Sequence, residues 1–445
     1  MEIVKSKMGF WSMMLLGVNA IVGSGIFLLP NKAYAQVGVY SLYVIIFDAF
    51  LVLCMALCFA EASGMFKKNG AAYVYAKEAF GEFVGFEVGF MKWAIGIIAW
   101  AAMAAAFTQA LSVVWEPAGH GATRTIIQVI MIGGLGIMNI LGVRISALFN
   151  NIVTVAKLIP LILFVAVGIF FLDKANFATT ASHVVQTATS ATSHLSTGLT
   201  TASFASAVLL MFYAFTGFEA IATASEDMEN PQKNLPKVIV SVIIAVVIFY
   251  ILILAVSIGT LGSSLAGSEA PIADAMKTFL GTWGRDLVLA GTIVSIGGIT
   301  LASSFLTPRT GVALASNGIL PKFIGKNGRF GTPTWAIAIT SVLAIFLSLS
   351  GTFYFLAAIS VISRFVQYLP TCVAVVVLRK KRPDLKSSFR IPFGPVIPAV
   401  AVIISFWLLY NSSMYKILFG LGGLVVGAVL YFIMQYINKK EASKA

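Results

Sequence analysis

The sequence predicts an all-α membrane protein with twelve transmembrane helices. Charged residues make up only 11% of the chain and hydrophobic residues 59%, whereas about a quarter of the residues of a soluble domain are charged. The apolar runs reach about 20 residues without alternating, which is typical of membrane helices and not of barrel strands. Because hydrocarbon admits only these two spanning structures, we expect helices throughout.

Polar or glycine-rich residues divide the apolar runs into twelve predicted spans. The first follows a polar stretch without a small-residue cleavage site, so we expect it to stay in the membrane and not to leave as a signal peptide. The predicted spans are residues 10–36, 39–62, 83–113, 126–142, 145–172, 199–225, 238–261, 287–315, 335–349, 353–378, 396–410 and 417–436.

The distribution of basic residues predicts the orientation. Of the 30 Lys and Arg residues, 21 lie in the loops or at the span ends on the side of the N-terminus and six on the other side, and Lys92, Lys157 and Arg364 lie deep within spans. Because basic loops stay in the cytoplasm, we expect a multi-pass protein of the plasma (inner) membrane with both termini cytoplasmic. The loop 173–196 is then external and is expected to be mobile. The net charge of +13, sorted in this way, gives no reason to expect a nucleic-acid partner.

Small residues interrupt two of the spans. The first span carries Gly23-Ser24-Gly25, and the sixth carries Thr216-Gly217. The first and sixth positions are those expected of a five-plus-five inverted repeat with two helices appended. We therefore predict a single domain over residues 1–445, with repeats at 10–172 and 199–378 and two further helices within 396–436.

A broken helix can bind a ligand through its backbone. The N–H groups that start the second half-helix attract an anion, and the carbonyls that end the first half-helix attract a cation. An α-amino acid carries both charges, so one break can match its zwitterion. The alternative is that Gly23, Ser24 and Gly25 form a small-residue packing face between helices. The second break in the sixth span favours the binding interpretation.

Four stretches resemble the amino acid–polyamine–organocation (APC) transporter family. Residues 23–30 read GSGIFLLP, which is similar to the motif of that family's first helix. Residues 214–236 resemble the sixth helix and the loop after it, residues 70–81 the second cytoplasmic loop, and residues 309–321 the end of the eighth helix. The resemblance extends from residue 9 to about residue 398. It implies the LeuT-like fold, alternating access and amino acid substrates.

The resemblance also implies a binding site. Gly23, Ser24 and Gly25 would receive the substrate carboxylate, and the carbonyls of the two breaks would receive its ammonium. The carbonyls would be those of Ile21, Tyr213 and Thr216, and Gly217 would complete the second break. The ring of Tyr213 would form an inner gate, where many family members carry Trp or Phe. A looser alignment adds Trp100, Ile299 and Ser360 as side-chain pocket residues, for which helix packing is the alternative.

Lys157 lies within the fifth span, where an ionisable side chain is a functional candidate. It is similar to a family lysine whose ammonium takes the place of a sodium ion and binds carbonyls of the broken first helix. We therefore expect no sodium dependence. A buried lysine can also exchange its proton as its surroundings change, so Lys157 is our candidate for proton coupling. A fixed charge would serve an exchanger equally well, and snorkelling to the interface is the structural alternative.

Arg364 lies within the tenth span and needs an acidic partner, because arginine cannot discharge itself. Asp48 and Glu219 are the candidates. In an inverted repeat the tenth helix corresponds to the fifth, so Arg364 is expected to brace the second break through Glu219 as Lys157 braces the first. The alternative is that Arg364 lines a cytoplasmic water cavity.

These observations predict a secondary transporter of amino acids, either a proton-coupled symporter or an exchanger. Neutral substrates are favoured because Trp100, Ile299 and Ser360 offer no carboxylate; a cationic amino acid or polyamine exchanger is the alternative. An intramembrane enzyme is disfavoured, since the three histidines (His120, His183 and His194) all lie in loops. We expect no cofactor and no metal, and the spans indicate no oligomeric state.

Overall fold

The structure is a computed structural model that describes residues 8–66, 72–142, 147–178, 199–223, 228–385, 387 and 389–442. Within these ranges the chain forms α-helices and short 3-10 helices (η), with one isolated bridge between Met8 and Met228 and no strand. Nine described helices are long and apolar enough to cross a membrane, and three shorter apolar helices accompany them. Together they match the twelve predicted spans, and the prediction of an all-α membrane protein is confirmed.

The elements follow the chain in two halves. The first half contains α1 (Phe10–Ile21), α2 (Ser24–Leu28), α3 (Pro30–Val37), η1 (Gly38–Tyr40), α4 (Ser41–Met65), α5 (Ala72–Phe80), α6 (Glu82–Ser112), η2 (Glu116–Gly119), α7 (Gly121–Ile140), α8 (Ala147–Gly168), η3 (Ile169–Phe171) and η4 (Lys174–Phe177). The second half contains α10 (Thr201–Phe212), η5 (Tyr213–Phe215), α11 (Glu219–Thr223), α12 (Pro231–Leu261), η7 (Gly262–Gly267), α13 (Pro271–Ser316), η8 (Lys322–Gly325), α14 (Thr334–Leu349), α15 (Phe353–Lys381), α16 (Val396–Tyr410) and α17 (Met414–Ala442).

Local sequence signals fix several helix boundaries. Thr200 and Ser203 form a reciprocal capping box at the start of α10, with both backbone-to-hydroxyl distances at 3.1 Å. Proline occupies the first turn of α3, α12 and α13, where its missing N–H costs nothing. Gly281 bends α13 through a positive φ of 65°, a conformation that glycine adopts without strain.

The structure differs from the predicted spans in three places. The expected first span, 10–36, is three helices, because the chain leaves the helix at Val22 and Gly23 and again before Pro30. Helix α5 lies in a segment predicted as a loop, and α13 begins at Pro271, well before the expected residue 287. The first part of the loop 173–196 is anchored, since Asp173 and Asn176 both donate to the carbonyl of Gly259. Residues 179–196, with His183 and His194, lie outside the described residues.

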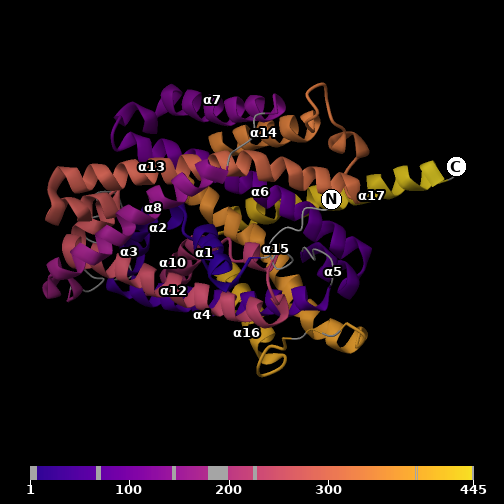
Figure 1. Ribbon diagram of the computed structural model, residues 1–445, viewed down its shortest axis with the longest axis horizontal. Helices are drawn as coiled ribbons and strands as arrows, with labels where there is room; N and C mark the ends of the chain where they lie inside the picture. The colour runs from indigo at the N-terminus through magenta and orange to yellow at the C-terminus, as the bar shows by residue number, and fades with distance from the viewer. Residues whose placement is uncertain are drawn as a thin grey trace.

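The broken helices occupy the middle of the bundle. In Figure 1, α1, α2 and α10 lie near the centre of the ribbon, and α4, α12, α13 and α15 surround them. Contacts join α1 to α12, α2 to α13, and α10 to both α4 and α15. The first and second halves of the chain therefore interlock at the breaks. Both termini lie toward the same end of the molecule (Figure 1).

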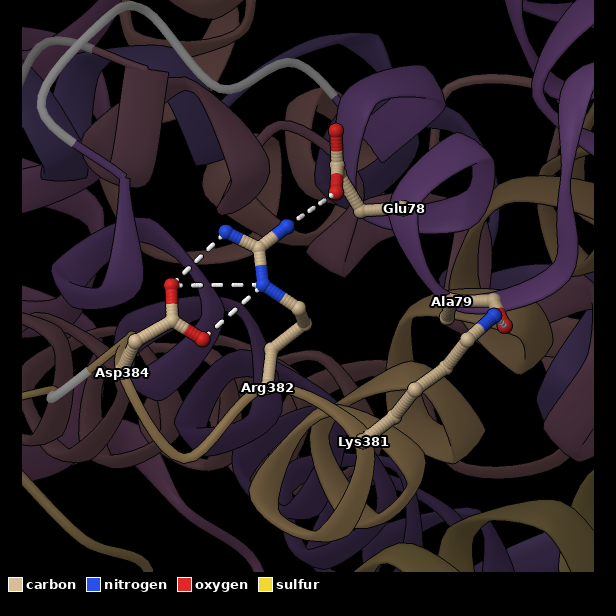
Figure 2. A network of polar contacts seen from close by, with 5 residues as sticks. All are labelled: Glu78, Ala79, Lys381, Arg382 and Asp384. Carbon is tan, nitrogen blue, oxygen red and sulfur yellow. Dashed lines mark hydrogen bonds and ion pairs between the residues drawn. The ribbon is translucent and has the colours of Figure 1, made fainter.

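Polar contacts clamp α15 at that end. Figure 2 shows Arg382 between Glu78 of α5, at 2.8 Å, and Asp384, at 2.7 Å. The hydrogen bond from Arg382 lowers the pKa of the Asp384 carboxyl below its ordinary value. Closer to the core, the guanidinium of Arg379 donates two hydrogen bonds, of 2.6 and 2.5 Å, to the fully buried Glu61 of α4. The clamp holds α15 in register with α4 and α5.

Candidate functional site

The first break lies between α1 and α2. Val22 ends α1 with an extended backbone (φ −69°, ψ 102°), and Gly23 is extended as well (φ −136°, ψ −154°) before α2 starts at Ser24. A helix end leaves its last carbonyls and first N–H groups without intrahelical partners. The break therefore presents carbonyl oxygens from α1 beside N–H groups from α2, in the arrangement expected from the sequence.

The second break lies between α10 and α11. After η5, Thr216 is extended and Gly217 has a φ of 111°, a region that L side chains rarely adopt. The N–H of Gly217 donates to Oε2 of Glu219 at 3.0 Å. The carbonyl of Tyr213 accepts from the Thr216 hydroxyl at 2.8 Å. The carboxylate of Glu219 thus holds the turn that opens the helix.

The two breaks pack directly against each other. A Cβ on Gly25 would lie 2.7 Å from Cα of Ala214, and a Cβ on Gly217 would collide with the carbonyl of Ala20. Glycine at 25 and 217 therefore allows the backbones of α2 and η5, and of α11 and α1, to touch. Small-residue packing therefore accounts for Gly25 and Gly217, and ligand binding by the neighbouring Gly23 and Ser24 stays a prediction.

Tyr250 of α12 joins the two breaks through its hydroxyl. The hydroxyl is within 2.9 Å of the carbonyl of Ala214 and within 3.4 Å of the carbonyl of Ile21, and the side chain is fully buried. A carbonyl has two lone pairs, so Ile21 keeps an acceptor site for a substrate ammonium. The sequence analysis missed Tyr250, because a tyrosine in an apolar helix resembles an ordinary packing residue.

Lys157 of α8 contacts the first break. Its Nζ donates to the carbonyl of Asn19 at 2.8 Å and to that of Val22 at 2.7 Å, and the residue is only 2% exposed. One turn earlier, the Thr154 hydroxyl lies 3.1 Å from Oδ1 of Asn19. The ammonium therefore sits at the negative end of the α1 dipole, where it satisfies carbonyls that the break has released.

Arg364 of α15 contacts the second break. Its guanidinium forms an ion pair with Glu219, and the Tyr368 hydroxyl lies 3.0 Å from Oε2 of the same carboxylate. The structure thus joins Arg364 to Glu219. The other candidate partner, Asp48, is fully buried and makes no hydrogen bond within the described part of the chain. Each break thus has a cation, the buried Lys157 at the first and the half-buried Arg364 at the second, although Arg364 acts through a carboxylate and Lys157 binds carbonyls directly.

The three predicted pocket residues differ in position. Ile299 of α13 lies 3.4 Å from the Cβ position of Gly23 and therefore borders the first break. Ser360 lies one turn before Arg364 on the same face of α15, and its buried hydroxyl has no described partner. Trp100 instead belongs to the apolar cluster that α6 forms with α7 and α14. Its buried indole N–H has no described partner, so a pocket role for Trp100 stays a prediction beside the packing alternative.

Aromatic side chains cover one side of the breaks, whereas some residues of the breaks themselves are exposed. The Tyr213 ring packs on Phe353 with centroids 5.7 Å apart, and both side chains are buried. At the breaks themselves, Ala20 is exposed, and Gly217 and Glu219 are half-buried. A ligand at the breaks would therefore be covered on one side by Tyr213 and Phe353.

The close contact at Gly25 gives a first prediction. We expect Gly25→Ala to lower the folded stability by about 1–3 kcal/mol, because a methyl group would push α2 from η5. Gly133→Ala in α7 is the matched control, since nothing lies within 4 Å of its Cβ position. Thermal unfolding of the purified variants measures the difference. Equal melting temperatures for the two variants would show that the breaks tolerate separation.

The fold and the paired breaks define a multi-pass transporter of the LeuT-like class. The profile of the amino acid permease family matches residues 8–437, and the chain belongs to this family. The family places the protein among transporters and gives no indication of an enzyme.

Relatives extend over nearly the whole chain. An uncharacterized transporter of Mycobacterium tuberculosis is 32% identical over 97% of this chain and 92% of its own length. The branched-chain amino acid permease BcaP of Bacillus subtilis is 26% identical over 98% of this chain and 94% of its own. The methylthioribose transporter of the same organism is 28% identical over 94% of this chain and 91% of its own. The protein is thus similar to transporters of chemically different small molecules.

Proposed function

We propose that the protein carries neutral amino acids across the plasma membrane by alternating access, without sodium. The observation that supports this most is the contact between the two breaks, which sets the free N–H groups of α2 beside the carbonyls of α1 and η5. Such a site binds the carboxylate and ammonium that all α-amino acids share. Ile299 and Ser360 then face the substrate side chain.

A neutral substrate fits the charges around this site. Among the described residues, Lys157 contacts the carbonyls of the first break and Arg364 pairs with Glu219, which Tyr368 and Gly217 also engage. A second cation on the substrate would therefore lack a dedicated carboxylate. This favours neutral amino acids over the cationic amino acids or polyamines of the alternative function.

Lys157 supports the sodium-independent part of the proposal. Its ammonium supplies a positive charge to the carbonyls of Asn19 and Val22, where a bound cation would otherwise be needed to satisfy them. The same group is the candidate for proton coupling in a symporter, and it would act as a constant charge in an exchanger.

The exposure of residues at the breaks supports a proposal for the conformational state. We infer that the exposed Ala20 and the half-buried Gly217 and Glu219 face the cytoplasm, the side on which the basic loops predict both termini to lie. Tyr213 and Phe353 then close the extracellular side. We therefore propose that the described conformation is inward-facing.

Ligand-dependent stabilisation tests the proposed substrate class. Purified protein is heated with each of the twenty amino acids, common polyamines and methylthioribose, because a ligand that binds the folded state raises its melting temperature. We expect neutral amino acids to raise the melting temperature. The amino acid that stabilises most is then labelled, and we expect its counterflow in proteoliposomes both with and without sodium. Stabilisation by methylthioribose or a polyamine alone would contradict the zwitterion site, since neither carries an α-carboxylate.

A further inference from the structure

A polar pocket of about 300 Å³ lies away from the breaks, where the ends of α7 and α13 meet the loop before α14. This loop and the loop between α15 and α16 lie at opposite edges of the molecule (Figure 1). We call this cavity the α7–α14 pocket. It is lined by Asn139, Gly142, Phe305, Pro308, Arg309, Phe330, Gly331, Thr332, Pro333 and Ile337.

Hydrogen bonds from side chains to backbone carbonyls join the elements that form this pocket. Pro308 has no N–H for the carbonyl of Ser304 one turn earlier in α13. The side-chain amide of Asn139 supplies that donor at 2.7 Å and is itself only 6% exposed. The Thr332 hydroxyl donates to the carbonyl of Ile140 at 2.6 Å. Helices α7 and α13 and the loop are therefore fixed around one cavity.

The charge in and beside the pocket is entirely positive. Arg309 is an exposed lining residue, its guanidinium lies over the Phe305 ring with 5.4 Å to the centroid, and none of the lining residues is acidic. The chain contains no Asp or Glu from residue 287 to residue 383. The exposed loop beside the pocket adds Lys326 and Arg329. Arg309 donates from Nη1 to the carbonyl of Phe305 at 3.4 Å and forms no ion pair with any described residue, so its other N–H groups are open to an anion.

Large apolar side chains surround this basic site. Leu306 is 65% exposed, Phe330 54% and Trp335 58%. Phe323 packs edge-on against Trp335 with centroids 6.1 Å apart. Exposed aromatics next to basic residues are typical of the membrane–water interface, where they contact acyl chains and headgroups. The pocket thus opens where lipid phosphates lie.

We propose that the α7–α14 pocket binds the phosphate of an anionic phospholipid headgroup, with Arg309 as its principal ligand. Arginine is suited to this chemistry, because its fork donates to two phosphate oxygens. Lys326 and Arg329 add to the electrostatic attraction, and the exposed Phe330 and Trp335 contact the acyl chains. A soluble phosphate would gain nothing from those apolar side chains, which distinguishes a lipid from a free anion.

Lipid binding to the full chain in nanodiscs tests the proposal. The nanodiscs are made of phosphatidylcholine with rising amounts of spin-labelled phosphatidylglycerol, and the immobilised fraction of the label is measured. We expect saturable immobilisation for the wild type and at least roughly fivefold weaker binding for Arg309→Gln, since one basic contact is lost. Arg390→Gln is the matched control, because Arg390 is also exposed but lies in the loop between α15 and α16; it should bind like the wild type.

Several outcomes would overturn the site. If Arg309→Gln binds the lipid as the wild type does, or if Arg390→Gln loses as much lipid binding, the basic surface attracts the lipid without a specific site. Displacement of the label by soluble glycerol phosphate at matched concentration would assign the pocket to a free phosphate compound. If Arg309→Gln does not fold, the double variant Lys326→Gln with Arg329→Gln leaves α13 unchanged. It should also weaken binding several-fold, and unaltered binding by it would equally contradict the proposal.

Discussion

Lys157→Ala is expected to abolish uptake while the protein still folds. The ammonium donates to the carbonyls of Asn19 and Val22 at 2.8 and 2.7 Å, and a hydrogen bond to a charged group contributes about 1.5–3 kcal/mol. Its loss leaves two carbonyls of the first break unsatisfied in a buried position. Because transport requires α1 and α8 to change contacts reversibly, a change of this size traps the carrier in one state.

Uptake in proteoliposomes separates the possible roles of Lys157. Wild type and Lys157→Ala are compared under an imposed proton gradient, and in counterflow without one. Lys277→Ala is the matched control, because Lys277 is exposed on the first part of α13, outside the breaks. A symporter loses gradient-driven uptake and an exchanger loses counterflow, in each case at least tenfold. Unchanged gradient-driven uptake by Lys157→Ala would exclude this residue from proton coupling.

The fold and the candidate roles of Lys157 and Arg364 at the breaks follow from simple patterns in the sequence. Apolar length gives the spans, and glycine and serine inside an apolar run identify the breaks. Lys157 and Arg364 stand out because a charge inside a span requires a partner. The predicted inverted repeat suggests Glu219 as the partner of Arg364, and the structure joins the two, although 145 residues separate them in the chain.

Other contacts could not be predicted because they leave no local pattern. Tyr250 bonds to Ile21, 229 residues away, and its side chain is like many other aromatics in apolar helices. Glu61 and Arg379 lie near the ends of their spans, where charged residues are usually solvated, yet they meet across 318 residues. For Trp100 the alignment predicted a pocket residue, and its side chain packs in the cluster of α6, α7 and α14, so its role stays a prediction.

Arg364→Gln and Glu219→Gln are each expected to stop transport and destabilise the fold. The two side chains are 13% and 23% exposed, so removing one partner leaves a mostly buried charge without compensation, at a cost that approaches that of a fully buried pair, about 3–5 kcal/mol. Glu219 also accepts from the N–H of Gly217 and from Tyr368, both at 3.0 Å. Neutralising it therefore loosens the turn at the second break as well, and either single variant should show at least a hundredfold lower uptake.

A double-mutant cycle measures the interaction in the pair. Thermal unfolding of the two single variants and of the double variant gives the coupling energy, and we expect the double variant to be more stable than Arg364→Gln alone, because no buried charge then remains unpaired. The exposed pair Lys77–Glu82, with 2.9 Å between Nζ and Oε1, is the matched control; such surface pairs contribute at most about 1 kcal/mol. A coupling energy for Arg364 and Glu219 no larger than that of the surface pair would mean that solvent already screens them. The second break would then be held by the Gly217 and Tyr368 contacts alone, and Arg364 would act as a residue of the water-filled cavity.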